Sequence, residues 1–232
     1  VYMLIHKEFK RDIIEFPKLK RITVNGTRHY IQEGRESSTP YPSVTSITAQ
    51  KNKEAIKQWR KRVGEAKANA ITTKAARRGT KAHILIEQYI SGLEVEQSMP
   101  TEFELYKKFH ETANESIDNI RSIEGQMYSD YLRVAGTVDL VAEYNCKLSV
   151  IDWKTSLKPK KEVWIHSYYM QAAAYAVMFE ENTKLPISQL VVIIGCETGE
   201  LQIFTAKRDD WIHKFIELRE IYDNLHNYRQ NS

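Results

Sequence analysis

The stretch Gly136-Thr-Val-Asp-Leu-Val-Ala-Glu-Tyr-Asn-Cys-Lys-Leu-Ser-Val-Ile-Asp-Trp-Lys154 predicts a β-hairpin that carries two acids and a lysine. Asn145-Cys146 suits a two-residue turn, which would place residues whose numbers sum to 291 opposite each other. Asp139 then faces Asp152, and Lys154 projects from the same face as Asp152. Because like charges opposed on a sheet repel each other, this pair predicts a divalent metal ion between the strands and an anionic substrate beside it.

The second strand of this hairpin has apolar residues on both faces, with Leu148 and Val150 on one and Ile151 and Trp153 on the other. Such a strand is central and buried, so an unpaired carboxylate and lysine at its end would be costly. A purely structural ion pair between the acid and the lysine is the simpler alternative. It leaves the acid on the opposite strand unexplained.

Glu124 extends the acidic pair to a row of three. If the preceding connection is centred on Asp130–Arg133, residues whose numbers sum to 263 face each other, and Glu124 lies opposite Asp139. The alternative is a surface glutamate at a strand edge. Oxygen ligands of this kind favour Mg²⁺ or Mn²⁺, as one or two ions, and Lys154 would orient an attacking water or neutralise charge that develops on a phosphate.

The rest of the chain alternates between helical and strand patterns. We expect a strand hairpin around Asn25-Gly26, helices at 51–64, 73–90 and 101–117, strands at 120–128, 134–144 and 147–155, a helix at 163–181, strands at 189–196 and 201–206, and a helix at 209–227. This order predicts an α/β fold in which helices flank a mixed central β-sheet. We expect an N-terminal hairpin and loop (1–42), a basic helical region (43–118) and a core (119–232) that form one compact unit.

The composition excludes several classes of protein. The 232 residues are 42% hydrophobic and 28% charged, without an apolar run of the roughly 18 residues that span a membrane and without a secretory signal. Cys146 and Cys196 are too few for a disulfide framework or a cysteine-rich metal site, so we expect an intracellular protein. Because the sequence begins at Val1 rather than Met, an upstream targeting segment stays an open alternative.

Positive charge is concentrated in one segment. Residues 51–81 contain eleven Lys or Arg against two Glu, a net charge of +9, whereas the whole chain carries only +4. Basic charge gathered in this way predicts contact with a polyanion, although a solvated helix face is the common alternative. Basic and aromatic groups together suit single-stranded nucleic acid, whose bases are free to stack. The candidate contacts are Lys57, Arg60, Lys61, Lys74, Arg77, Arg78, Lys81, Trp59, Tyr168 and Tyr175, where core packing is the alternative for Trp59 and helix packing for Tyr175.

Three motifs together resemble those of a known family. Gly136-x-x-Asp139, Asp152-x-Lys154 and Gln171-x-x-x-Tyr175 resemble the PD-(D/E)xK nuclease superfamily in its RecB-like branch. The stretches 150–160 and 41–45 are similar to the family of mitochondrial genome maintenance exonucleases and their phage-encoded relatives. The resemblance covers roughly residues 40 to 225. It departs from the superfamily's name motif at Val138, where that motif has proline.

The resemblance implies a restriction-endonuclease-like core with a helical arch, and it implies roles for particular residues. Asp139, Asp152 and the main-chain carbonyl of Trp153 would bind the metal, Lys154 would be the catalytic lysine, and Glu124 an additional acid. Gly79-Thr80-x-x-His83 resembles the helical segment that supplies a metal-binding histidine, although a satisfied buried histidine is the alternative. Glu87 lies one helical turn after His83 on the same face. Gln171 would lie near the metal or the cleaved phosphate.

These observations predict a metal-dependent exonuclease that threads a free end of single-stranded DNA, hydrolyses its phosphodiester bonds and leaves 5′-phosphates. We expect a monomer whose partner is DNA and not a membrane, located in a host cytoplasm if phage-encoded or a mitochondrion if eukaryotic. Repair, recombination and phage DNA degradation all remain open as its role. The alternatives are a structure-specific or double-strand endonuclease of the same superfamily, and a nuclease-derived module that binds DNA without cleaving it.

Overall fold

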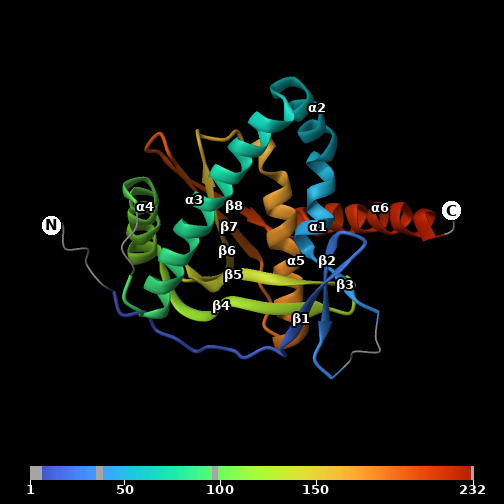
Figure 1. Cartoon of the computed structure of the whole chain (residues 1–232). Helices are drawn as coiled ribbons and strands as arrows, with labels where there is room; N and C mark the ends of the chain where they lie inside the picture. Colours follow the sequence, from blue (N-terminus) through green and yellow to red (C-terminus); the bar gives the residue numbers. More distant parts are fainter. Residues whose placement is uncertain (1–6, 35–38, 96–98, 231–232) are drawn as a thin grey trace.

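A five-stranded mixed β-sheet forms the centre of the computed structural model, which describes residues 7–34, 39–95 and 99–230 (Figure 1). Its order is β4-β5-β6-β7-β8. The strands are β4 (Ile117–Ser129), β5 (Val134–Tyr144), β6 (Lys147–Ser156), β7 (Gln189–Cys196) and β8 (Leu201–Lys207). β6 and β7 are parallel and the other neighbours antiparallel, so the predicted mixed sheet is confirmed.

The turn between β5 and β6 is the predicted two-residue turn. Asn145 and Cys146 have φ angles of 50° and 62°, and two successive positive φ angles define the tight turn whose twist matches a β-hairpin. Tyr144 pairs with Lys147, and the ladder runs in that register up to Leu140 and Ile151. The predicted register is therefore confirmed over this part of the hairpin.

Helices cover both faces of the sheet. The helices are α1 (Val44–Thr48), α2 (Lys53–Val63), α3 (Glu65–Ser91), α4 (Pro100–Ser116), α5 (His166–Thr183) and α6 (Ile212–Gln230). On one face, side chains of α3 and α4 such as Ile86 and Phe109 share a core with Ile151. On the other, Phe179 of α5 and Phe215 of α6 pack in a second core. α5 connects the parallel strands β6 and β7, which need a crossover of this kind.

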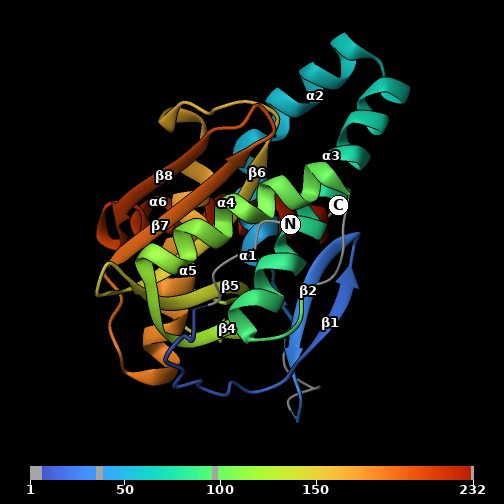
Figure 2. The same ribbon diagram turned by 90° about the vertical axis from the view of Figure 1, so that its left-hand side faces the viewer.

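The hairpin of α2 and the first half of α3 extends away from the sheet, as both views show (Figures 1 and 2). α2 buries none of its residues, and the first half of α3 buries only Ala68. Gly64 joins the two helices with a φ of +87°. We expected the second helix to begin at residue 73, and the structure corrects this to Glu65. We placed the expected start where the apolar stripe that contacts the core begins. The first half of α3 is exposed and has no such stripe.

Other elements lie within a few residues of their expected positions. The N-terminal hairpin is β1 (Leu19–Val24) and β2 (Thr27–Gln32), to which the short β3 (Tyr41–Pro42) pairs; residues 35–38 of the expected loop lie outside the described part. Ser43 caps α1, where its hydroxyl accepts a hydrogen bond of 3.1 Å from the Ser46 backbone N–H. Short 3₁₀ turns η1 (Ala49–Asn52), η2 (Glu162–Trp164) and η3 (Arg208–Asp210) precede α2, α5 and α6. Within the described residues, every helix is too short or too polar to cross a lipid bilayer.

Candidate active site

The acids of the hairpin lie where β5 and β6 separate. The ladder between these strands ends at Leu140 and Ile151, one pair before Asp139 and Asp152. Beyond that pair, the Asp139 carboxylate takes the place of a backbone acceptor, because the backbone N–H of Trp153 donates a hydrogen bond of 3.0 Å to its Oδ2. The two acids thus occupy the position that follows the last printed pair of the predicted register, and they line a gap between strands that are no longer paired there.

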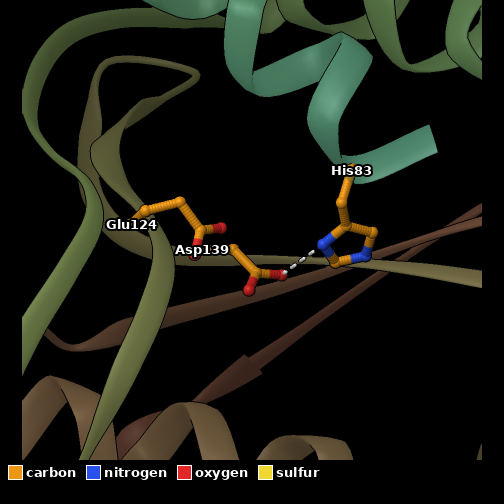
Figure 3. Close-up of side chains that lie close together, drawn as sticks. All are labelled: His83, Glu124 and Asp139. Carbon is orange, nitrogen blue, oxygen red and sulfur yellow. Dashed lines mark ion pairs between the residues drawn. The ribbon is translucent and has the colours of Figure 1, made fainter. Parts of the chain in front are cut away.

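Glu124 reaches the same gap from β4. The pairs Ile123–Leu140 and Gly125–Val138 flank it in the predicted register, and its φ of +46° departs from strand geometry. Potential metal-ligating atoms of Glu124, Asp139 and His83 all lie within 4.8 Å of one another, and Nδ1 of His83 is 3.7 Å from Oδ2 of Asp139 (Figure 3). The sheet and α3 therefore bring together two carboxylates and an imidazole that are far apart in sequence.

Asp152 has one paired and one unpaired oxygen. Its Oδ1 accepts hydrogen bonds from Lys154 Nζ at 2.6 Å and from Gln171 Nε2 at 3.2 Å. Its Oδ2 is buried and has no hydrogen-bond partner within the described part of the chain. A buried oxygen without a partner is unfavourable, and a divalent cation would supply the missing partner. Together with two further carboxylates and a histidine, this donor set fits a hard divalent ion.

The backbone of Trp153 is directed toward the same place. In a β-strand, the N–H and C=O of one residue point to the same side, and the N–H of Trp153 points to Asp139. The Trp153 backbone also lies close enough to His83 to raise the pKa of its imidazole, against the larger effect of burial. The indole is buried and packs on Phe109, with 5.1 Å between the ring centroids. A role for the carbonyl as a metal ligand stays a prediction, and this orientation agrees with it.

The raised pKa values of the carboxyl groups in this cluster show that their negative charges are not fully compensated by nearby positive charge. Glu124 is exposed as a whole, but partial desolvation of its carboxylate, followed by the charges of Asp139 and Glu87, raises its pKa to about 8. Burial raises the pKa of Asp152, an effect that Lys154 opposes and Asp139 reinforces. Burial acts against the charge of Lys154, yet Asp152 and Asp139 raise the pKa of this lysine and keep it protonated.

Two further groups belong to the same electrostatic environment. Burial is the main cause that lowers the pKa of His83, so the imidazole is neutral near pH 7 and able to bind a metal. Glu87 acts electrostatically on both His83 and Glu124. Its i, i+4 spacing from His83 is the sequence signal that places it here.

Gln171 and Tyr175 lie one helical turn apart on α5, with different surroundings. Gln171 contacts Asp152, as described. Tyr175 is only 3% exposed and covers Gly136, where an added Cβ would lie 2.9 Å from the tyrosine oxygen. The tyrosine ring has no free face on which a base could stack. The structure therefore corrects the expectation that Tyr175 contacts DNA, and it explains the glycine of the first motif by close packing.

The predicted basic contacts divide into exposed and paired side chains. Arg78 forms an ion pair with Glu197, which follows β7, and so connects α3 to the sheet. Arg60 pairs with Glu65 across the α2–α3 junction. Nothing in the sequence signals either partnership. The exposed members are Lys57, Lys61, Lys74 and Arg77, whereas Trp59, Lys81 and Tyr168 are half-buried. DNA contact by this set stays a prediction.

Comparisons with known proteins match the chain to a nuclease family. Residues 28–231 match the family described as the PD-(D/E)XK nuclease superfamily. Mitochondrial genome maintenance exonuclease 1 of Xenopus tropicalis is 28% identical over 172 residues, which cover 68% of this chain and 49% of that protein. The human protein of the same name is 26% identical over 174 residues, or 68% of this chain and 50% of that protein. The chain thus spans about half the length of the curated relatives it matches.

Proposed function

The chain belongs to the PD-(D/E)XK nuclease superfamily, and we propose that it is a metal-dependent exonuclease that hydrolyses single-stranded DNA from a free end and leaves 5′-phosphates. One observation carries the catalytic part of the proposal. Asp152 is buried with its Oδ2 unpaired, beside a cluster of His83, Glu124 and Asp139. A module that only binds DNA has no use for such an arrangement.

The residues of this cluster would hold Mg²⁺ or Mn²⁺, as one or two ions. The donors are His83, Glu124, Asp139, Oδ2 of Asp152 and the carbonyl of Trp153. When bound, a hard divalent ion supplies Lewis-acid polarisation of the phosphate and activation of water. These donors are mostly oxygens, which separates the site from the thiolate-rich sites of zinc and iron–sulfur proteins.

Lys154 and Gln171 support this chemistry from the protein side. The Lys154 ammonium group lies 2.6 Å from Oδ1 of Asp152 and keeps its proton, so it can orient an attacking water and stabilise negative charge that develops on the phosphoryl oxygens. Gln171 donates to the same Oδ1 at 3.2 Å. The two donors hold the carboxylate so that its other oxygen remains available for a cation.

The single-stranded substrate is proposed from the α2–α3 hairpin. This hairpin carries exposed basic side chains at Lys57, Lys61, Lys74 and Arg77. It extends away from the sheet, and the second half of its helix α3 holds His83 (Figure 1). Basic helices beside aromatic groups such as Tyr168 suit a strand whose bases are unpaired. Curated relatives carry the name of mitochondrial genome maintenance exonucleases, and we extend exonuclease action on DNA, as a monomer, to this chain. Free Cys146 and Cys196 support a reducing, intracellular site of action.

Removal of either central group tests the proposal. We expect Asp152→Ala and Lys154→Ala each to reduce cleavage of end-labelled linear single-stranded DNA in Mg²⁺ or Mn²⁺ by at least about 10²-fold, since each removes charge from the reacting centre. EDTA should stop the wild-type reaction. Matched controls are Glu217→Ala and Lys207→Ala, which remove exposed groups outside the site. Undiminished cleavage by either active-site variant would contradict the assignment.

The form of the substrate separates an exonuclease from its alternatives. An enzyme that threads a free end leaves circular single-stranded DNA intact, whereas an endonuclease cuts it. Linear double-stranded DNA tests the double-strand alternative in the same assay. Calorimetry that detects no Mn²⁺ binding would instead support a binding module without catalysis.

A further inference from the structure

A cavity of about 290 Å³ lies between the small β1-β2-β3 sheet and the end of the β4–β5 pair, close to the lower size limit of ligand pockets. Three tyrosines line it, Tyr30, Tyr41 and Tyr128, together with Leu19 and Ala135. The phenol oxygen of Tyr41 donates a hydrogen bond of 2.7 Å to Asp130 Oδ1. Tyr30 is only 5% exposed and forms part of the cavity wall, so the half-buried rings of Tyr41 and Tyr128 are the ones that can contact a base.

The floor of this cavity lies on the same strand pair as the candidate metal site. Tyr128 pairs with Ala135 and Gln126 pairs with Thr137, and the next pair of positions in that register is Glu124 and Asp139. Four residues of strand separate the cavity floor from the acids, a distance of about 13 Å.

The cavity lies on the side of the sheet from which His83 approaches Asp139, whereas Asp152 contacts Gln171 of α5 on the other side. A Cβ on Gly136 would point to Tyr175 of α5, so the side chain of its neighbour Ala135 points to the opposite face. His83 approaches Asp139 from α3, which covers the face opposite α5. The half-exposed Thr137 lies between the two places. A strand that enters the metal site from the side of His83 can therefore continue over Thr137 into the cavity.

The chemistry of the cavity suits a base and not a phosphate. Among the described residues that line it, none is a lysine or an arginine, and one is an aspartate. A phosphate would find no counter-charge among these described residues. Aromatic side chains bind any unpaired base through its flat face, at about 1–3 kcal/mol per base.

We propose that this cavity binds one unstacked nucleobase of the DNA strand, a small and fixed number of nucleotides from the phosphate that is cleaved. The inference rests on the proposed function and adds a base-binding subsite to it. Such a subsite would hold the strand in place between successive cleavage steps.

The test uses oligonucleotides that carry one abasic residue. The wild-type enzyme should degrade the strand and slow about tenfold at one step, offset by a fixed number of nucleotides from the abasic position, because that step leaves the cavity without its base. Tyr128→Ala should cleave intact strands more slowly and lose this offset pause. Thr39→Trp, at an exposed lining position, should block the cavity with the same result and without removing a buried group. Tyr131→Ala is the matched control, because Tyr131 is 74% exposed in the adjoining turn and does not line the cavity.

The outcomes separate failure of this inference from failure of the proposed function. If the wild type degrades DNA but shows no offset pause, or if Tyr128→Ala and Thr39→Trp keep the pause unchanged, the subsite is wrong while the nuclease stands. If the wild type cleaves no DNA, the proposed function fails. A binding measurement in EDTA then still decides on the cavity: 2-aminopurine should be quenched at one position of the bound strand in the wild type and not in Thr39→Trp, and equal quenching in both would overturn the subsite.

Discussion

At the scale of single residues, the two oxygens of Asp152 have different surroundings. Oδ1 is neutralised by Lys154 and oriented by Gln171, whereas Oδ2 is buried without a partner. A buried acceptor left unpaired costs about 1–3 kcal/mol, so the site is destabilised until a cation binds. The same asymmetry orients the carboxylate before the metal arrives.

Gln171→Leu tests this orientation. Loss of the amide donor should weaken Mn²⁺ binding by about 10–100-fold, as is usual for groups that orient a metal ligand, while Lys154 still pairs with Asp152. Calorimetric titration with Mn²⁺ measures the effect. In an Asp152→Ala background the same substitution should have little further effect, and equal effects in both backgrounds would show that Gln171 does not act through Asp152.

At the scale of elements, the α2–α3 hairpin contains two neighbouring arginines with different surroundings. Arg78 pairs with Glu197 and is half-buried, whereas Arg77 is exposed. One side chain connects the hairpin to the sheet, and the other is available to a ligand. The pair therefore offers a matched comparison of stability and DNA binding.

Arg77→Gln should weaken single-stranded DNA binding and reduce the slope of log affinity against log salt by about 0.7, the value for one phosphate contact in a single strand, and should leave the Tm unchanged. Arg78→Gln should lower the Tm, because Glu197 loses its partner. Fluorescence anisotropy across a salt series and thermal melts measure both variants. A Tm loss in Arg77→Gln that equals that in Arg78→Gln would contradict this division of roles.

The elements also show how far the sequence alone could lead. The β4–β5–β6 register could be predicted from the positions of the turns and the two-residue period of a strand, because strand pairing across short turns is a local property. The separation of the strands at Asp139 and Asp152 could not be predicted, since it depends on the Asp139 side chain taking the Trp153 N–H. The start of α3 and the pairing of Arg78 with Glu197 depend on exposed or distant contacts that leave no periodic signal. The spacing of Tyr175 on its helix was compatible with DNA contact and with helix packing. Its burial in the structure favours packing.

At the scale of the whole molecule, the acid cluster links stability to pH and to metal. The pKa of Glu124 is raised from 4.5 to about 8 in the folded protein, and that of Asp152 is also raised. Between pH 4.5 and about pH 8, Glu124 keeps its proton in the folded, metal-free protein, whereas it has released this proton in the unfolded chain. The free energy of unfolding therefore falls as pH rises through this window.

In EDTA, we expect the Tm to fall between pH 5 and 8, and Mn²⁺ to raise it more at pH 8 than at pH 6, because the metal binds the ionised carboxylates. The contribution of Glu124 should be about 1–2 kcal/mol, less than its pKa shift alone implies because the side chain is exposed to solvent. Thermal melts at several pH values measure this. Glu124→Gln should flatten the pH dependence in EDTA, and an unchanged slope in that variant would show that the linkage arises elsewhere.

The parallel pairing of β6 with β7 has a consequence for the order of folding. β6 meets β5 across a two-residue turn, but it meets β7 only after the chain has passed through α5. Loop closure therefore favours early formation of the β4–β6 meander, which already carries Glu124, Asp139, Asp152 and Lys154. In stopped-flow refolding, Cys146→Gly, which eases the positive φ of the turn, should speed folding, whereas Arg78→Gln should mainly speed unfolding. The carboxylates would then be close together on the β4–β6 meander before α3 packs against the sheet and brings His83 to the site.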